Sequence, residues 1–292
     1  MNFVKKENGK PWRIIDVINW GVDYFENKSL ENPRLEIEIF LQHILDCKKI
    51  ELYTNFENKV SAHDLNTLKG YIKRRLRNEP SQYIVGKSNF YGRDFYVDNN
   101  VLIPRPETEI LINACIEFLS MKGNPEIIDI GTGSGCIGIT LAKEIPSSNV
   151  IAIDCSEKAL AVAEKNAKNI GIKNIDFVKS DFLKQTIDLR ADLLVSNPPY
   201  IPTTDISTLE QDVRDYEPLS ALDGGPDGLT IHRAIADQAG AVLKTGGLIA
   251  VEFGINQSTS IKKIYGAAGF SSMNIHSDLS GTDRCLLATV TN

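Results

Sequence analysis

Asn197, Pro198 and Tyr200 are the residues of this sequence whose types and spacing best suit chemistry. They follow Leu193–Val195, an apolar run that is typical of a short buried strand. Proline fixes φ near ~−65° and lacks an N–H, so the two prolines stop the strand and keep Asn197 extended. Such a rigid turn can hold a planar –NH2 group, because Asn197 Oδ1 and the Pro198 carbonyl accept its two N–H bonds and Tyr200 stacks on its face. We therefore expect these three residues to be catalytic, with Pro199 completing a substrate-binding turn.

The same motif also allows a purely structural interpretation. Asparagine and proline are common turn formers, so an isolated Asn-Pro-Pro predicts no more than a turn. Its position favours the chemical interpretation, because ligands of open α/β sheets bind at the carboxyl ends of the strands.

A glycine-rich stretch lies upstream, between an apolar strand and the expected start of a helix, where glycines let the backbone pass close to a ligand. Gly133 to Gly138 fits the Gly-x-Gly-x-x-Gly pattern of dinucleotide-binding proteins. A tighter glycine spacing starts earlier, behind Asp129, and favours S-adenosylmethionine, whose amino-acid end needs polar partners and which has no pyrophosphate. We expect Asp129 to anchor the ammonium group of this cofactor or to hold the loop. The loop residues expected to contact the cofactor are Gly131, Thr132, Gly133, Ser134 and Gly135.

Two further strands end in residues that suit the same cofactor. Asp154 ends the second strand, about 20 residues on, where a carboxylate can accept both ribose hydroxyls of either cofactor. Asp181 follows the third strand and can accept from the adenine amino group. Phe182 can cover the adenine ring, which is the favoured interpretation, and a core position is the alternative.

Strand-like and helix-like segments alternate from residue 125 onward, which predicts a parallel sheet covered by helices. The clearest helix spans 157–170, another lies near 256–268, and an earlier one opens at Pro106 and runs to about Lys122. The strands are expected at 126–130, 149–154, 175–180, 192–196, 247–253, 271–277 and 284–290. The last two should pair as a terminal hairpin. The expected fold class is α/β, a doubly wound, mostly parallel seven-stranded Rossmann-like sheet with a small N-terminal helical domain and a β-hairpin linker.

The N-terminal part has a different pattern. Residues 12–79 show helical spacing, and helix starts are expected at Asn32-Pro33 and at Ser61 with Asp64. Between 82 and 104 the period changes to two, which predicts hairpin strands at Tyr83–Gly86 and Phe90–Val97. The expected domains are a helical substrate-recognition domain at 1–80, the hairpin linker at 81–104 and the catalytic domain at 105–292.

One long connection and two charged residues near a helix start carry further predictions. Thr203–Leu229 is long for a strand–helix connection, and such loops are often functional. We expect it to cover the substrate, with Asp223–Gly228 as a hinge-like turn. Arg105 and Glu107 are placed to approach a ligand, although a helix N-terminus explains them as well.

Composition excludes several classes of protein. The 292 residues hold no stretch of about 18 apolar residues, so no membrane span is expected. Met1–Glu7 lacks an apolar signal region, and we expect a cytoplasmic protein. The five cysteines are scattered, so neither a disulfide framework nor a metal site is expected. The basic run Lys69–Arg77 is either a solvated helix face or a contact with an acidic partner.

The order of the motifs resembles class I S-adenosylmethionine-dependent methyltransferases that act on a planar nitrogen. Two groups share Asn-Pro-Pro-Tyr: nucleic-acid adenine-N6 methyltransferases and protein glutamine-N5 methyltransferases. From about residue 30 onward the chain is similar to the peptide chain release factor glutamine methyltransferases. The segments that carry this resemblance are Leu102–Glu109, Asp212–Leu219, Ala221-Leu222 and the helical N-terminal domain.

This resemblance implies methyl transfer from S-adenosylmethionine to the glutamine of the Gly-Gly-Gln motif in class I release factors. It implies cofactor contacts for Gly131 to Gly135, Asp154, Phe182 and Asn197, and substrate contacts for Asn197 to Tyr200. Phe182 departs from the tryptophan often found there in bacterial members, so stacking is kept and an indole N–H is lost. The implied partners are release factors, with no membrane and no stable nucleic-acid binding, and the expected state is a monomer.

Three alternatives stand beside this hypothesis. An adenine-N6 methyltransferase acting on DNA or RNA predicts a basic face across the cleft, whereas residues 105–292 hold 16 Lys and Arg against 24 Asp and Glu. A nicotinamide-dependent oxidoreductase leaves Asn-Pro-Pro-Tyr unexplained and offers no obvious Tyr-x-x-x-Lys or histidine acid. A nucleotide-binding scaffold or ribosome-associated adaptor requires the turn to be structural only.

Overall fold

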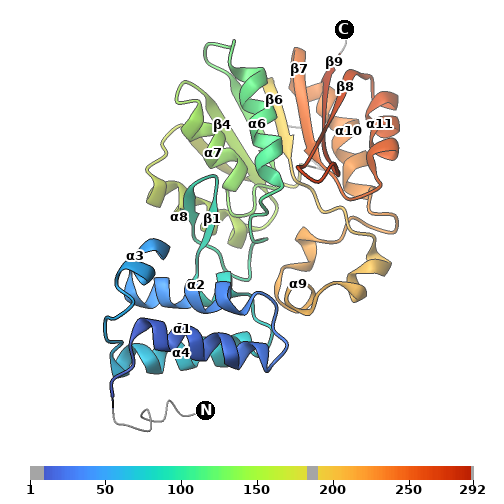
Figure 1. The fold of residues 1–292 in the computed structure, drawn as a ribbon. Coiled ribbons are helices and arrows are strands. Elements are labelled where there is room, and N and C mark those ends of the chain that lie inside the picture. The colour runs from blue at the N-terminus through green and yellow to red at the C-terminus, as the bar shows by residue number, and fades with distance from the viewer. Residues whose placement is uncertain (1–9, 183–189, 291–292) are drawn as a thin grey trace. The chain divides into compact units, whose positions relative to one another are not determined.

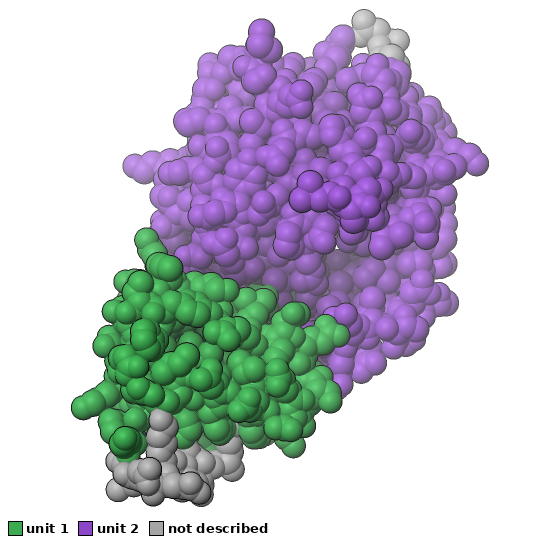
Figure 2. Space-filling model, in the orientation of Figure 1, with its two compact units in different colours: residues 1–85 green, residues 86–292 purple. Residues whose placement is uncertain are grey.

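The computed structural model describes residues 10–182 and 190–290, in two compact units that comprise residues 1–85 and 86–292 (Figure 2). Met1–Glu7, where the sequence predicts no signal region, lies outside the described residues. The first unit is helical, as predicted. Its helices are α1 (Ile14–Glu26), α2 (Pro33–Leu45), α3 (Lys49–Thr54), α4 (Ala62–Arg75) and α5 (Ser81–Val85).

The helices of the first unit begin where the sequence predicts and bury one apolar core. Asn32 precedes Pro33 at the start of α2, and the Ser61 hydroxyl accepts the Asp64 N–H at the start of α4. Gly21 of α1 lies so close to Ile37 of α2 that an added Cβ would stand 2.4 Å from the Ile37 Cδ1 atom. The close packing buries large side chains fully, each worth about 1.5–3 kcal/mol. Among them are Phe25, Ile37, Phe40, Leu41, Leu68 and Ile72.

The basic run Lys69–Arg77 is partly neutralised within its own unit. Arg74 pairs with Glu79 at 2.5 Å, and Arg75 pairs with Glu36 at 3.2 Å. These pairs favour the interpretation of the run as a helix face. Within the described ranges, no helix of the chain has the length and apolar character needed to cross a membrane.

The predicted strand at Tyr83–Gly86 is wrong, because Ser81–Val85 forms α5. Pro80 starts this helical turn: its carbonyl accepts the N–H groups of Tyr83 and Ile84. Three apolar residues were too few to distinguish a period of two from a helical turn, and Ile84 packs into the helical core. The predicted single strand Phe90–Val97 is also wrong, because a turn divides it, although a hairpin does lie within the predicted linker, at Ser88–Phe95.

The hairpin pairs β1 (Ser88–Phe90) with β2 (Arg93–Phe95) in antiparallel register. Its turn is Tyr91-Gly92, and both residues have positive φ, which matches the twist that two-residue hairpins require. Phe90 and Phe95 are buried in the core of the second unit, so the hairpin packs as part of that unit.

The second unit alternates helices and strands around a seven-stranded sheet (Figure 1). Its helices are α6 (Thr108–Leu119), α7 (Cys136–Glu144), α8 (Glu157–Ile170), α9 (Gln211–Tyr216), α10 (Thr230–Val242) and α11 (Ser258–Ala267). Its strands are β3 (Glu126–Ile130), β4 (Asn149–Asp154), β5 (Ile175–Lys179), β6 (Ala191–Ser196), β7 (Leu243–Glu252), β8 (Phe270–Ser277) and β9 (Asp283–Val290). All seven predicted strands are confirmed, with β7 starting four residues early.

The strand order is β5-β4-β3-β6-β7-β9-β8. The first five strands are parallel, and β9 pairs antiparallel with both β7 and β8, so the predicted terminal hairpin is confirmed. Successive side chains of each strand point to opposite faces. Ile127 and Leu193 thus pack with α6 and α7, whereas Ile128 and Leu194 pack with α10 and α11. The two covered faces define a doubly wound α/β fold.

The long connection between β6 and α10 is not structureless. It contains a 3₁₀ turn at Thr203–Thr208, then α9, then a second 3₁₀ turn at Leu219–Ala221. Ile201 forms a short parallel bridge with Asp223, which returns the connection to the residues just after the Asn197 turn.

Candidate active site

The carboxyl ends of β3 and β6 lie side by side in the sheet. Ile130 of β3 is in register with Ser196 of β6, and the Ser196 hydroxyl donates to the Ile130 carbonyl at 2.8 Å. The strand order reverses here, since β4 and β5 lie beyond β3 whereas β7 lies beyond β6. Ligands of doubly wound sheets bind at such a switch point. The glycine-rich loop and the Asn197 turn therefore meet at one edge of the sheet.

The glycine-rich loop leaves β3 through Gly131, Gly133 and Gly135, whose φ angles are 68°, 55° and 81°. The N–H groups of Gly131 and Thr132 both donate to the Ile153 carbonyl of β4, at 2.8 and 3.0 Å. An added Cβ at Gly131 would meet nothing within 4 Å. The loop is thus held on the sheet while its outer side borders open space that a ligand can fill.

Asp129 of β3 is fully buried behind this loop. Its Oδ2 accepts the Thr132 hydroxyl at 2.6 Å and the Gly138 N–H at 3.0 Å. Burial raises the pKa of the carboxyl to about 6, and within the described part of the chain Oδ1 has no hydrogen-bond partner. Asp129 therefore holds the loop, one of its two predicted roles, and keeps one oxygen available. Gly138 lies inside α7, where an added Cβ would stand 2.9 Å from Asp129, so this glycine serves helix–strand packing.

A cavity of about 220 Å³ opens beside the loop. The predicted cofactor residues that line it are Gly131, Thr132, Gly133, Ser134, Asp154, Asp181, Phe182 and Asn197. Gly135 does not line it. An added Cβ at Gly135 would stand 2.6 Å from Ile139 and 3.1 Å from Ala163, so this glycine lets α7 and α8 approach the loop.

Asp154 ends β4 with both carboxylate oxygens engaged. Oδ2 accepts the Gly133 N–H at 3.0 Å, and Oδ1 accepts the Ser156 N–H at 2.8 Å. A carboxylate oxygen can accept a second bond, so the side chain still has acceptors for a ligand. Phe182 lines the cavity and also belongs to the same core cluster as Ile153, so its core interpretation is confirmed, whereas its contact with adenine stays a prediction.

The Asn197 side chain is oriented by residues outside its own turn. Its Nδ2 donates to Thr108 Oγ1 at 3.2 Å and to the Glu252 carboxylate. No donor within the described ranges bonds Asn197 Oδ1 or the Pro198 carbonyl. Both predicted acceptors are therefore available. The Tyr200 hydroxyl donates to Glu252 over 3.5 Å, and burial raises the pKa of Tyr200.

A second cavity, of about 110 Å³, lies on the Tyr200 side of the turn. Asn197 and Pro198 line both cavities, whereas Pro199 lines the larger one and Tyr200 the smaller one. The remaining lining of the smaller cavity is mostly apolar: Leu102, Arg105, Ile201, Val213, Ala221 and Leu222. The two cavities therefore share a wall that contains Asn197 and Pro198 together with Leu102, Arg105 and Ala221.

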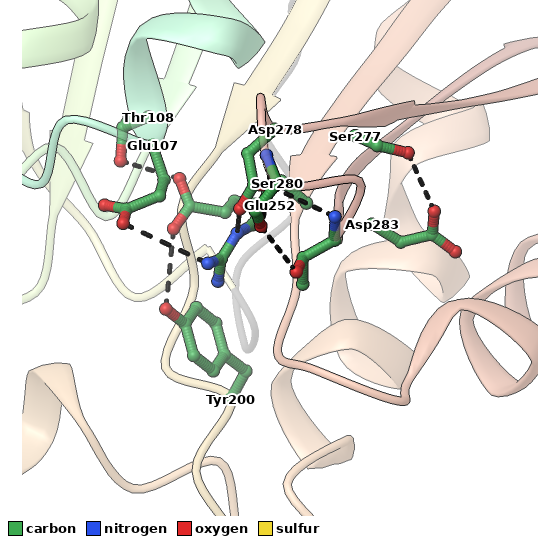
Figure 3. A network of polar contacts seen from close by, with 10 residues as sticks. Glu107, Thr108, Tyr200, Glu252, Ser277, Asp278, Ser280 and Asp283 are labelled. Carbon is green, nitrogen blue, oxygen red and sulfur yellow. Dashed lines mark hydrogen bonds and ion pairs between the residues drawn. The ribbon is translucent and has the colours of Figure 1, made fainter.

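Glu252 lies at the carboxyl end of β7 and is only 2% exposed. Figure 3 shows Thr108 and Tyr200 reaching its carboxylate from different elements, and the Thr108 hydroxyl donates to Glu252 Oε2 at 2.6 Å. Burial, aided by the nearby charge of Glu107, raises the pKa of Glu252 to about 7. Arg284 of β9 lies 4.0 Å from the Glu107 carboxylate and lowers this pKa in part.

Sequence reasoning missed Thr108 and Glu252. The acidic residues before α6 suggested a helix cap, yet Glu107 makes no side-chain capping bond and Thr108 points its hydroxyl at β7. One signal was present: Glu252 is the only charged residue in the apolar run 248–253, and it ends a strand at the ligand-binding edge.

Arg105 approaches the site, as one interpretation of the sequence predicted. Its Nη2 donates to Glu217 at 2.6 Å, and Glu217 also accepts the Ile103 N–H at 3.4 Å. Glu217 is buried, which raises its pKa. This ion pair ties the connection between β6 and α10 to the segment before α6, and both segments line the cavities.

A glycine-rich loop at the switch point of a doubly wound sheet is typical of the class I S-adenosylmethionine-dependent methyltransferases, and fold comparison agrees. A methyltransferase from Pyrococcus furiosus matches with a TM-score of 0.51 at 16% identity, covering 78% of this chain and all of that one. The hMettl16 catalytic domain, solved with a 3′UTR hairpin, matches with a TM-score of 0.55 at 16% identity, covering 68% and 76%. At this identity the likeness establishes the fold alone.

Sequence comparison narrows the class. Residues 16–86 match the PrmC N-terminal domain family, and residues 108–211 match the methyltransferase small domain family. The release factor glutamine methyltransferase of Geobacter sulfurreducens is 38% identical, over 95% of this chain and 97% of its own length. That of Chlorobaculum tepidum is 37% identical over the same shares. The chain belongs to the family of release factor glutamine methyltransferases.

The family and fold predictions from the sequence are therefore confirmed, including S-adenosylmethionine as the cofactor of the class. The adenine-N6 alternative gains no support from these relatives. The oxidoreductase and scaffold alternatives likewise leave the match to methyltransferase families unexplained.

Proposed function

We propose that this protein transfers a methyl group from S-adenosylmethionine to the side-chain amide nitrogen (N5) of the glutamine in the Gly-Gly-Gln motif of class I peptide chain release factors. One observation carries the proposal: Asn197 and Pro198 line both cavities. The larger one has the glycine-rich loop, and the smaller one has the size and apolar walls for an amide side chain. The relatives named above are release factor glutamine methyltransferases.

The residues around the larger cavity fit S-adenosylmethionine. Gly131 and Gly133 line the cavity, and an added Cβ at Gly131 would meet nothing within 4 Å. Behind the loop, Asp129 Oδ1 is a buried acceptor with no partner among the described residues, and Asp154 has acceptors left for ribose hydroxyls. Asp181 and Phe182 would bind the adenine amino group and cover the ring. When bound, the cofactor supplies an electrophilic methyl group on a sulfonium.

Asn197 and Pro198 activate the amide by accepting both of its hydrogens. An amide nitrogen is a poor nucleophile, because its lone pair is delocalised into the carbonyl. The Asn197 Oδ1 and the Pro198 carbonyl draw electron density onto the nitrogen and aim it across the shared wall of the two cavities. The nitrogen becomes positive during transfer, so the same acceptors bind it more strongly in the transition state. Positioning supplies most of the acceleration, and no general base is needed, since the proton leaves afterwards.

Tyr200 and Pro199 complete the substrate site. Gly254, two residues after β7, packs against the Tyr200 ring: an added Cβ there would stand 3.0 Å from the ring. This close packing restricts the position of the ring. The ring forms a wall of the smaller cavity and stacks on the substrate amide.

The connection Thr203–Leu229 covers the substrate glutamine in this proposal. Val213, Ala221 and Leu222 line the smaller cavity, and the Glu217–Arg105 pair holds the segment in place. Replacing it with a short linker should abolish transfer while S-adenosylmethionine still binds. Unchanged activity would contradict the covering role. The predicted hinge at Asp223–Gly228 stays a prediction.

The helical residues 1–80 would grip the release factor away from its Gly-Gly-Gln tip, with 81–104 as the linker to the catalytic domain at 105–292. The proposed setting is the cytoplasm, with the protein acting as a monomer and without stable nucleic-acid binding.

The test incubates a recombinant release factor with the protein and S-adenosylmethionine and locates any added methyl by fragment-ion mass spectrometry. The expected result is one CH2 unit of added mass on the Gly-Gly-Gln glutamine. An oligonucleotide in a parallel reaction is the control. A methylated oligonucleotide with an unmodified release factor would overturn the proposal in favour of adenine-N6 transfer.

A further inference from the structure

The buried polar cluster of Thr108, Asn197, Tyr200 and Glu252 contains more than the proposed transfer step uses. Thr108 is 1% exposed and Glu252 is 2% exposed, and they are 144 residues apart in sequence. Neither belongs to the glycine-rich loop or to the Asn197 turn. Burying a carboxylate destabilises the folded state unless hydrogen bonds or a nearby cation compensate for its lost hydration. The position of Glu252 beside the reacting amide therefore requires an explanation.

The directions of the hydrogen bonds in this cluster are fixed by the ionised carboxylate. A carboxylate only accepts, so the single hydrogen of the Thr108 hydroxyl goes to Glu252 Oε2, 2.6 Å away. The Thr108 oxygen is then left as an acceptor for the next group. Asn197 Nδ2 lies 3.2 Å from it and also donates to Glu252. Each bond therefore runs from Asn197 toward Glu252.

This direction determines which end of the Asn197 amide faces the substrate. If the amide were reversed, Oδ1 would face a hydroxyl oxygen with no free hydrogen and a carboxylate, both of them acceptors. Such contacts repel and leave buried groups unsatisfied. With Glu252 ionised, the NH2 group faces inward and Oδ1 faces the shared wall of the cavities, where a substrate –NH2 needs an acceptor.

We infer that Glu252 and Thr108 are positioning residues that orient the Asn197 amide, so that Oδ1 rather than Nδ2 is presented to the substrate nitrogen. The inference rests on the proposed function and adds residues that act through Asn197 without joining the transfer. The turn alone cannot set this orientation, because rotation about the last bond of the asparagine side chain exchanges two groups of nearly equal size.

Protonation of Glu252 would remove the constraint. A neutral carboxyl can donate to Thr108, whose own hydrogen is then free to bond Asn197 Oδ1 and stabilise the reversed amide. The groups facing Glu252 come from several elements: Glu107 before α6, Cys136 of α7, Tyr200 after β6, and Arg284 and Cys285 of β9. Glu107 opposes ionisation of Glu252 and Arg284 favours it. Turnover is therefore expected to fall on the acid side of neutrality.

Thr108→Val provides the direct test, since it removes the hydroxyl and keeps the shape. In assays at pH 8, kcat for methyl transfer should fall on the order of 10- to 100-fold, with S-adenosylmethionine affinity near that of the wild type. The melting temperature should fall as well, because buried Glu252 and Asn197 each lose a hydrogen bond. Thr108→Ser restores the hydroxyl and should recover most of kcat. The matched control is Thr140→Val on α7, because the Thr140 hydroxyl is buried and has no hydrogen-bond partner within the described residues. It should leave kcat unchanged.

Glu252→Gln tests the same inference through the pH dependence of kcat, which a residue with only a structural role would not change. The variant should lower kcat at pH 8 and flatten the acid limb of the pH profile, while its melting temperature at pH 8 stays at or above that of the wild type. If Thr108→Val fails to fold, the kcat and pH profile of Glu252→Gln test the inference in its place.

The outcomes separate two failures. An active wild type with kcat unchanged in both Thr108→Val and Glu252→Gln overturns the inference and leaves the proposed function intact. No transfer by the wild type to a release factor overturns the proposed function and the inference together. Loss of kcat with serine rescue and unchanged cofactor affinity supports the inference.

Discussion

Gly224→Ala adds a single methyl group that should displace the Asn197 turn while every residue of the turn stays the same. Gly224 lies in the connection between β6 and α10, against the residues that follow Asn197. An added Cβ would stand 2.8 Å from the Pro199 carbonyl, 2.8 Å from Tyr200 Cα and 2.7 Å from the Gly228 carbonyl. All three are backbone atoms, so no flexible side chain can move aside.

The size of the disturbance follows from these distances. Ordinary contacts begin at 3.4 Å, so the Pro199–Tyr200 backbone must retreat by about 0.6 Å, from 2.8 Å. Retreat of Gly224 itself is opposed by its N–H bond to the Ile201 carbonyl and by the Thr230 N–H bond to its own carbonyl, both 2.9 Å. A misplacement of ~1 Å costs ~100-fold in rate, so ~0.6 Å should cost roughly 10-fold in kcat.

Stability should fall as well, because overpacking costs about 1–3 kcal/mol. For a unit of this size the melting temperature should drop by roughly 2–12 °C. S-adenosylmethionine affinity should change little, since Gly224 does not line the larger cavity. The assays are methyl transfer to a release factor, isothermal titration with the cofactor, and thermal unfolding.

The matched control is Gly240→Ala in α10, where an added Cβ meets nothing within 4 Å and alanine favours the helix by about 1 kcal/mol. It should keep kcat and gain stability. A folded Gly224→Ala protein whose kcat is within twofold of the wild type would refute the reasoning, since the turn would then tolerate the displacement.

Three further predictions concern the two cavities and the buried acids. Asn197→Ala should lower turnover by at least ~100-fold while calorimetry finds the cofactor still bound. Asp154→Ala should weaken S-adenosylmethionine binding roughly 10- to 100-fold, and unchanged affinity would exclude its proposed role. Burial raises the pKa of Asp129 to about 6 and that of Glu252 to about 7, so the folded state keeps protons that the unfolded state loses. The free energy of unfolding should therefore fall as pH rises from about 4.5 to 7, and urea titrations of Glu252→Gln should show a smaller fall.

Local patterns predicted most of the fold of the second unit. A strand followed by a glycine-rich turn, or by two prolines, is determined by short-range sterics that the sequence displays directly. β3, β4 and α8 therefore lie within a residue of their predicted bounds. The pattern failed at Tyr83–Gly86, where three apolar residues did not distinguish a strand from α5.

Local patterns also predicted which residues line the larger cavity, with one exception. Asp154 and Asn197 were identified because Asp154 ends β4 and Asn197 directly follows β6 at the ligand-binding edge. Gly135 was assigned to the cofactor on spacing alone, whereas the structure packs it against Ile139 and Ala163. Spacing shows that a residue must be small and does not show which neighbour requires it.

The sequence by itself therefore determined the class of fold, the cofactor loop and the Asn-Pro-Pro-Tyr turn, because these depend on backbone geometry and on periods of a few residues. Only the tertiary structure decided how the Asn197 amide is held. Its partner Thr108 is 89 residues away and begins α6, and Thr108 in turn bonds Glu252, which is 144 residues further on and ends β7. Hydrogen bonds between side chains depend on distance and direction in space, and those exist only after the sheet has brought β6 and β7 together and α6 has packed against them.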